Sequence, residues 1–129
     1  MQVLRWLTLA VVLALTFFGG SSTQAASPPE QAVVIHFQYG STDLKRLFAL
    51  EERLESALSG SAIGEYDGNE IATDGSDGFL YLYGPDADRL FDAIEPVLRA
   101  TPFMRGAQVT KRYGPPEAGV KESSVVISS

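Results

Sequence analysis

The sequence predicts an α+β domain, a ferredoxin-like βαββαβ sandwich in which an antiparallel sheet carries two helices on one face. Two observations predict this class. Short segments rich in β-branched and aromatic residues alternate in polarity, whereas two longer segments repeat apolar residues at helical spacing. Their order along the chain is strand, helix, strand, strand, helix, strand. Two right-handed crossovers then place both helices on the same side of the sheet.

The strands are predicted from polarity and turn signals. Residues 32–40 (AVVIHFQYG) form the first strand, and residues 79–83 (FLYLY) give the strongest strand signal in the chain. Residues 107–113 (AQVTKRY) alternate as a half-buried strand, whereas 63–73 (IGEYDGNEIAT) predict an irregular or edge strand broken at an Asp-Gly-Asn turn. Residues 120–127 are either a further strand, paired as a hairpin with the preceding one, or a frayed tail.

The first helix is predicted from Leu44 to the Ser59-Gly60 stop, because glycine favours the end of a helix. The second opens at Gly84-Pro85-Asp86, and we expect Pro96 to kink it or end it early. The positions expected to be buried are Leu44, Leu47, Phe48, Leu54 and Leu58 in the first helix, and Leu90, Phe91, Ile94, Val97 and Leu98 in the second.

The first 25 residues have the pattern of a secretory signal peptide. Arg5 makes the head positive, residues 7–18 are almost all apolar, and residues 19–26 (GGSSTQAA) are small and polar. Cleavage after Ala25 leaves a short linker over residues 26–31. The alternative is an uncleaved anchor, although the apolar run is shorter than the roughly 20 residues that a span needs. We therefore expect an exported bacterial protein, periplasmic or secreted.

The domain is predicted over residues 32–114, with residues 115–129 as a C-terminal extension or an extra edge strand. Without the first 25 residues, the chain carries 9 Lys and Arg against 16 Asp and Glu, a net charge of −7, because only Arg5 is charged in the removed part. This acidity favours solubility and disfavours nucleic-acid binding, which needs clustered cations. We expect no membrane association after cleavage.

The chain offers little catalytic chemistry. It has no cysteine and a single histidine, His36, which excludes a disulfide, a thiol nucleophile and a histidine-based metal cluster. Ser41 lacks the surroundings of a nucleophile elbow, and Gly84-Pro85-Asp86 leads into acidic residues that repel phosphate. We predict a non-enzymatic protein without metal or cofactor; a hydrolase that uses acidic carboxylates is a less favoured alternative.

The predicted sheet has one face without helices. If Val33, Ile35 and Leu80 lie under the helices, the residues that alternate with them lie on this open face. Tyrosine-rich surfaces favour protein interfaces, although the tyrosines can also simply cover the sheet while their hydroxyls reach water. We predict a protein or peptide partner here, with a second copy of the chain as another possibility. The predicted contact residues are His36, Gln38, Tyr81, Tyr83, Thr110 and Arg112.

A second candidate surface is the acidic, glycine-rich segment 65–77 (EYDGNEIATDGSD), interpreted as an acidic loop. Its oxygen-bearing side chains are ligands that calcium prefers, and a calcium-stabilised structural domain is the alternative function. A calcium loop that starts at Asp67 places Ile71 where an oxygen is required and Ala72 where a glycine is required. The predicted contact residues of the loop are Asp67, Glu70, Asp74 and Asp77.

Three segments resemble a family of small uncharacterised bacterial proteins: residues 66–70 (YDGNE), 74–88 (DGSDGFLYLYGPDAD) and 112–116 (RYGPP). This resemblance spans nearly all of the chain after the signal peptide, implies a ferredoxin-like fold and supplies no catalytic residues. The alternation and turn pattern are also remotely similar to the ribonuclease E inhibitor B family of small ferredoxin-like regulators. That similarity implies a small acidic binding module, although the partner of that family is cytoplasmic.

Overall fold

The computed structural model describes residues 30–128, so the predicted signal peptide and most of the linker lie outside the described residues. No helix in this part of the chain is long and apolar enough to cross a membrane. The elements follow the order βαββαββ, which confirms the α+β class. They are β1 (Gln31–Gln38), α2 (Lys45–Leu58), β2 (Glu65–Ile71), β3 (Asp77–Gly84), α3 (Ala87–Arg99), the 3₁₀ helix η2 (Pro102–Met104), β4 (Gln108–Arg112) and β5 (Glu122–Val126).

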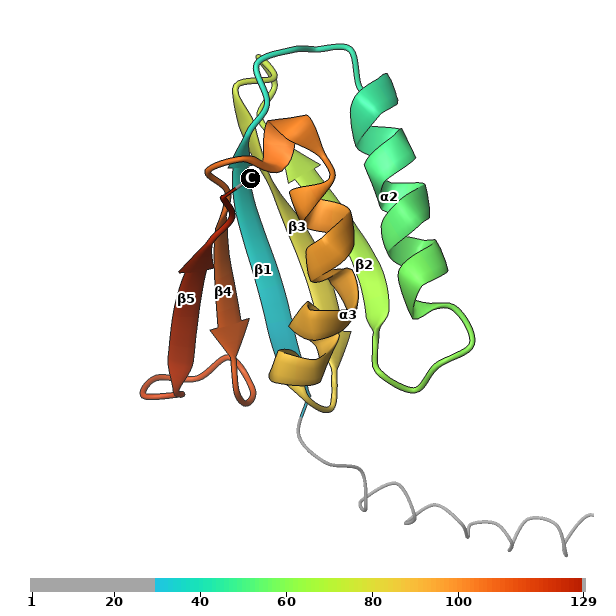
Figure 1. The fold of residues 1–129 in the computed structure, drawn as a ribbon. Coiled ribbons are helices and arrows are strands. Elements are labelled where there is room, and N and C mark those ends of the chain that lie inside the picture. The colour runs from blue at the N-terminus through green and yellow to red at the C-terminus, as the bar shows by residue number, and fades with distance from the viewer. Residues whose placement is uncertain (1–29, 129) are drawn as a thin grey trace, which may run out of the picture.

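The five strands form one antiparallel sheet in the order β2-β3-β1-β4-β5, and both helices lie on one side of it (Figure 1). The order of the first four strands is consistent with the predicted arrangement. The predicted further strand is confirmed as β5, which pairs with β4 as a hairpin, so the frayed-tail alternative is wrong. Because β5 extends the edge of the sheet, it leaves the side without helices uncovered.

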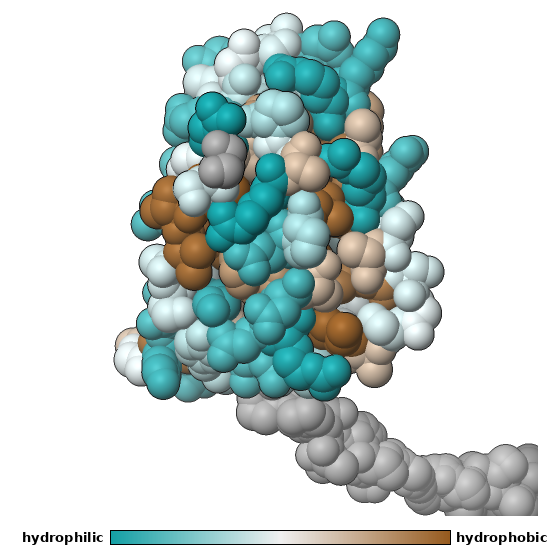
Figure 2. Space-filling model, in the orientation of Figure 1, coloured by the Kyte–Doolittle hydropathy of each residue, from teal (hydrophilic) through white to brown (hydrophobic). Residues whose placement is uncertain are grey.

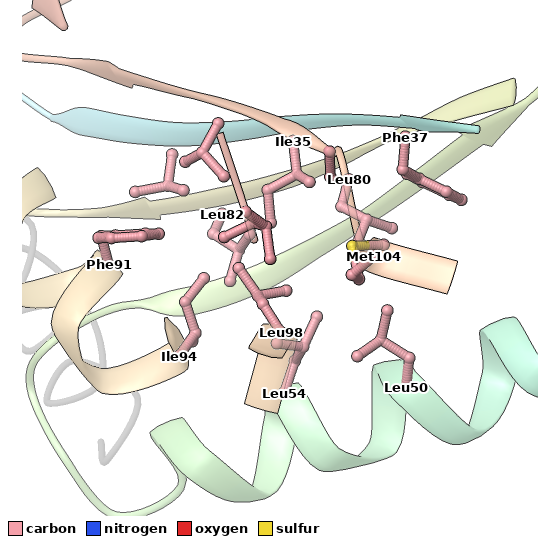
Figure 3. Packing of buried hydrophobic residues seen from close by; sticks show 14 of the residues in the cluster. Ile35, Phe37, Leu50, Leu54, Leu80, Leu82, Phe91, Ile94, Leu98 and Met104 are labelled. Carbon is pink, nitrogen blue, oxygen red and sulfur yellow. The ribbon is translucent and has the colours of Figure 1, made fainter. Parts of the chain in front are cut away.

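The core lies between the sheet and the two helices (Figure 3). Ile35 on β1 and Leu80 and Leu82 on β3 are fully buried, as the alternation predicts. Leu54 of α2 and Leu98 of α3 pack against them from the helix side. Each such side chain contributes about 1.5–3 kcal/mol by leaving water.

Two details of the helices differ from the sequence prediction. Phe48 is 52% exposed, because it lies on the outer side of α2, and Leu50 takes the buried position instead. Helix α3 does not end at Pro96 but continues to Arg99. Pro96 lies near the end of the helix on its exposed side, where the backbone donor that proline lacks is less costly to lose.

The irregular or edge strand predicted over residues 63–73 is confirmed as β2, so the interpretation of residues 65–77 as an acidic loop is wrong for most of that segment. Residues 65–71 form the edge strand β2, which pairs with β3 and is interrupted by a bulge at Asp67. The turn that follows is attached to the connection between β1 and α2: Tyr39 N–H donates to the Ser76 carbonyl (2.8 Å) and Gly40 N–H to the Gly75 carbonyl (2.7 Å). These backbone bonds hold the turn in place against the β1–α2 connection.

Candidate functional site

The sheet face without helices, called the open face below, collects all six predicted contact residues. Strand pairing aligns its side chains in three rows that cross the sheet from β2 to β5. The first row is Glu70, Phe79, His36, Gln108 and Val126; the second is Gly68, Tyr81, Val34, Thr110 and Ser124; the third is Glu65, Tyr83, Ala32, Arg112 and Glu122. Gln38 lies beyond the first row, opposite Asp77.

An aromatic stripe, defined as His36, Phe79, Tyr81 and Tyr83, lies along β1 and β3 on this face. The imidazole of His36 stacks on the Phe79 ring with centroids 4.6 Å apart, and Phe79 stacks on Tyr81 at 6.2 Å. Phe79 is 36% exposed, and Tyr81 and Tyr83 are half-buried. His36, Phe79 and Tyr81 therefore form a continuous, partly exposed stack, and Tyr83 extends the stripe on the same face of β3.

His36 is fixed at one end of the stripe by a carboxylate. Its Nε2 lies 2.7 Å from Oδ2 of Asp77, the first residue of β3, and each side chain is about one-third exposed (36% and 35%). This pair and the stacking on Phe79 together set the orientation of the imidazole ring.

Tyr81 is fixed in the middle of the stripe by Glu70 of the edge strand β2, to which its hydroxyl donates a hydrogen bond. This bond, helped by desolvation and by the negative charge of Glu70, raises the pKa of Tyr81 to about 12. The hydroxyl therefore stays protonated at neutral pH and faces Glu70. A tyrosine that acts as a base or nucleophile needs a lowered pKa. Tyr81, whose pKa is raised, is therefore better suited to binding through its ring and its protonated hydroxyl.

The four predicted acidic residues separate into two pairs with different roles. Glu70 and Asp77 lie on the open face and contact the aromatic stripe. Asp67 lies at the bulge of β2, and Asp74 lies in the turn, where it accepts from the Ser76 backbone N–H at 2.9 Å. Hydrogen bonds from Ser76, first its side chain and then its backbone, lower the pKa of Asp74.

The acidic residues thus do not form the single contact surface that the sequence suggested. Within residues 30–128, no group of three or more histidine, aspartate and glutamate side chains is placed to hold a metal ion. Two features separate these residues: the bulge at Asp67 changes which β2 residues follow one another on a given face, and Asp74 lies in the turn beyond β2.

The opposite side of the open face is formed by β4 and β5. Arg112 is half-buried, and its Nε donates to the Gly114 carbonyl at 2.7 Å, which holds the guanidinium group near the sheet edge. Thr110 is half-buried in the middle row, and Gln108 is exposed. Arg112 and polar groups therefore lie opposite the acidic edge formed by β2, with Glu122 of β5 as the acidic neighbour of Arg112.

Val126 belongs to the open face but was not a sequence candidate. It is 61% exposed and ends the first row, next to Gln108. The sequence left residues 120–127 open between a strand and a tail, so no face was assigned to them. On the helix side of the molecule, apolar surface also gathers over the β4–β5 edge (Figure 2).

No protein-family model matches this chain, and no curated protein or solved structure matches it. The resemblances noted from its sequence motifs therefore stay predictions.

Proposed function

We propose that this protein is an exported, non-enzymatic domain of ferredoxin-like fold that binds a protein or peptide partner through its open face. The aromatic stripe carries this proposal. Its four rings form a partly exposed surface, and no helix or strand among residues 30–128 lies across it. Aromatic residues supply large contact area at low conformational cost and are enriched in protein interfaces.

The contacts of the stripe favour binding over catalysis. Glu70 accepts from Tyr81 and Asp77 pairs with His36, so each carboxylate already has a partner. An acid–base pair needs carboxyl groups directed at a substrate, whereas these two orient aromatic rings. Orientation before binding reduces the entropy lost when a partner docks.

The charges around the stripe indicate the chemistry of the partner. Glu65, Glu70 and Asp77 lie along the β2–β3 side of the open face. Arg112 lies toward β5, opposite Glu122, so the face has several carboxylates and one arginine. A segment with apolar side chains next to lysine or arginine matches this arrangement, because its cations can pair with the carboxylates and contact the aromatic rings. Arg112 can then donate to a carbonyl or carboxylate of the same segment.

The test is to cross-link the exported protein in the envelope of its source organism and identify what it captures. The double variant Tyr81→Ala/Arg112→Ala should lose the partner, and affinity for the purified partner should fall tenfold or more if these residues are hot spots. Arg89→Ala, on α3 and far from the open face, is the matched control. Circular dichroism establishes that each variant is folded.

Capture that survives in the double variant would contradict the assignment of this surface. Capture of only a second copy of the chain would show that the face self-associates. Export itself is tested separately, because N-terminal sequencing of the exported protein should begin at Ala26.

A further inference from the structure

A separate apolar groove lies on the helix side of the molecule, between α2 and η2. Ala49 and Leu50 of α2 and Pro102 and Phe103 of η2 line it, and its volume is about 180 Å³. An apolar cavity of about 150 Å³ accommodates a benzene ring. The groove therefore has room for one side chain the size of phenylalanine or leucine.

Two arginines of α2 complete the lining, and each is held without a carboxylate. The Arg46 guanidinium lies 4.8 Å from the centre of the Tyr39 ring and 5.4 Å from that of Phe103. Arg53 donates to the hydroxyl of the buried Thr101. No carboxylate of residues 30–128 lies within 4.0 Å of either group. The aromatic rings hold Arg46 and the Thr101 hydroxyl holds Arg53, and neither contact neutralises the positive charge of the arginine.

The charge around this groove contrasts with the acidic chain as a whole. A neighbouring hollow shares Thr101 and Pro102 with the groove and is lined by Arg99 and Arg105. Of these two, Arg99 is paired, with Glu95 at 2.6 Å. A chain with 16 acidic and 10 basic side chains thus gathers four arginines around one turn. The positive charge is concentrated beside an apolar opening.

We infer that this groove binds an acidic peptide segment. One apolar side chain of the peptide enters the groove, and carboxylates on either side of it pair with Arg46 and Arg53. Guanidinium groups bind carboxylates through paired N–H donors. Among residues 30–128, the hydrogen bond from Arg53 to Thr101 is the one that either guanidinium makes, so most of the five donors of each arginine are available to a ligand. A space for one side chain favours a peptide over an acyl chain. The site lies across the sheet from the open face and is independent of it.

The test uses the exported protein and fluorescence anisotropy with the labelled peptide Gly-Glu-Phe-Glu-Gly. Two matched peptides replace both glutamates with glutamine, or the phenylalanine with glycine. Only the first peptide should bind, and added salt should weaken its binding. Arg46→Gln and Arg53→Gln should each lower the affinity about tenfold, since a charged hydrogen bond is lost. Arg89→Gln removes the same charge on α3 and should change it less than about twofold.

A second variant tests the groove without removing an arginine. Ala49 is exposed on α2, so Ala49→Glu keeps the core intact and should abolish binding by repelling the peptide. Equal binding of the glutamine peptide, unchanged affinity in both arginine variants, or no binding of the acidic peptide would each overturn the inference. Arginine-dependent binding to phosphatidylglycerol vesicles without peptide binding would also overturn it and assign the site to lipid headgroups.

Discussion

The two faces of the sheet are built from the same strands but differ in burial and in the contacts that hold their side chains. On β1, Ile35 is fully buried beneath the helices, whereas the side chain of the next residue, His36, is 36% exposed. Residues on the covered face are held by close packing with leucines of α2 and α3. Residues on the open face are held by pairwise contacts between neighbouring strands, as in His36–Asp77 and Tyr81–Glu70. Stability therefore resides mainly on the covered face, and the open face is the surface that we propose binds a partner.

Adjacent residues of β3 give the largest test of this difference. Leu80 is fully buried and Tyr81 lies on the open face, so Leu80→Ala should cost about 2–5 kcal/mol of unfolding free energy. Tyr81→Ala should cost about 1 kcal/mol, because it removes one exposed hydrogen bond and one ring contact. Urea unfolding measures both values. Similar costs would mean that the open face is part of the structural core.

The turn between β2 and β3 gives the next largest effect. Gly75 has φ +74°, and an added Cβ would lie 2.0 Å from the Ser41 carbonyl oxygen, so Gly75→Ala should cost about 1–3 kcal/mol. Asp74→Ala in the same turn should cost less than about 1 kcal/mol, because the side chain is exposed and bonds only within the turn. Thermal unfolding distinguishes them. A larger effect at Asp74 would show that the acidic side chain, rather than the backbone contact, maintains the turn.

Alkaline pH should affect a tyrosine on each face. Burial, followed by its hydrogen bond to Glu51, raises the pKa of Tyr66 on the helix side, and the bond to Glu70 raises that of Tyr81. Both pKa values are higher in the folded chain, so this stability is fully present below about pH 10 and is lost as pH rises through the folded values. Urea unfolding at about pH 9 and about pH 11 should show the decrease. Tyr66→Phe and Tyr81→Phe should each reduce this decrease by a similar amount, because up to about pH 11 the loss follows the deprotonation of the unfolded tyrosine and both folded pKa values lie higher. A decrease that is unchanged in Tyr66→Phe would contradict the assignment.

The smallest effect concerns Glu70 alone. Glu70→Gln removes the charged acceptor, so the pKa of Tyr81 should fall from about 12 toward the ordinary value of about 10. Ultraviolet titration of the tyrosines follows this shift, with Tyr81→Phe identifying the signal. The unfolding free energy should change by less than about 0.5 kcal/mol, because the site is exposed. An unchanged titration would mean that Glu70 does not hold Tyr81.

Much of the open face was predictable because strand alternation is a local property. A period of two along β1 and β3 is enough to separate Val33 and Leu80 from His36 and Tyr81. The helices were less fully predictable at single positions. Phe48 fits an apolar helical pattern as well as Leu50 does, and only the docking of α2 on the sheet leaves Phe48 outside.

The sequence by itself determined the succession of the first four strands and two helices and the face on which the residues of β1 and β3 lie, since both follow from the spacing of neighbouring residues. Only the tertiary structure decided which of these residues meet. His36 and Asp77 are 41 positions apart, and Arg53 and Thr101 are 48 positions apart. The first pair depends on the register between β1 and β3, and the second on how η2 docks beside α2. A register shift of two residues would keep every side chain on its face but would change its partners across the sheet, so local spacing cannot fix these contacts.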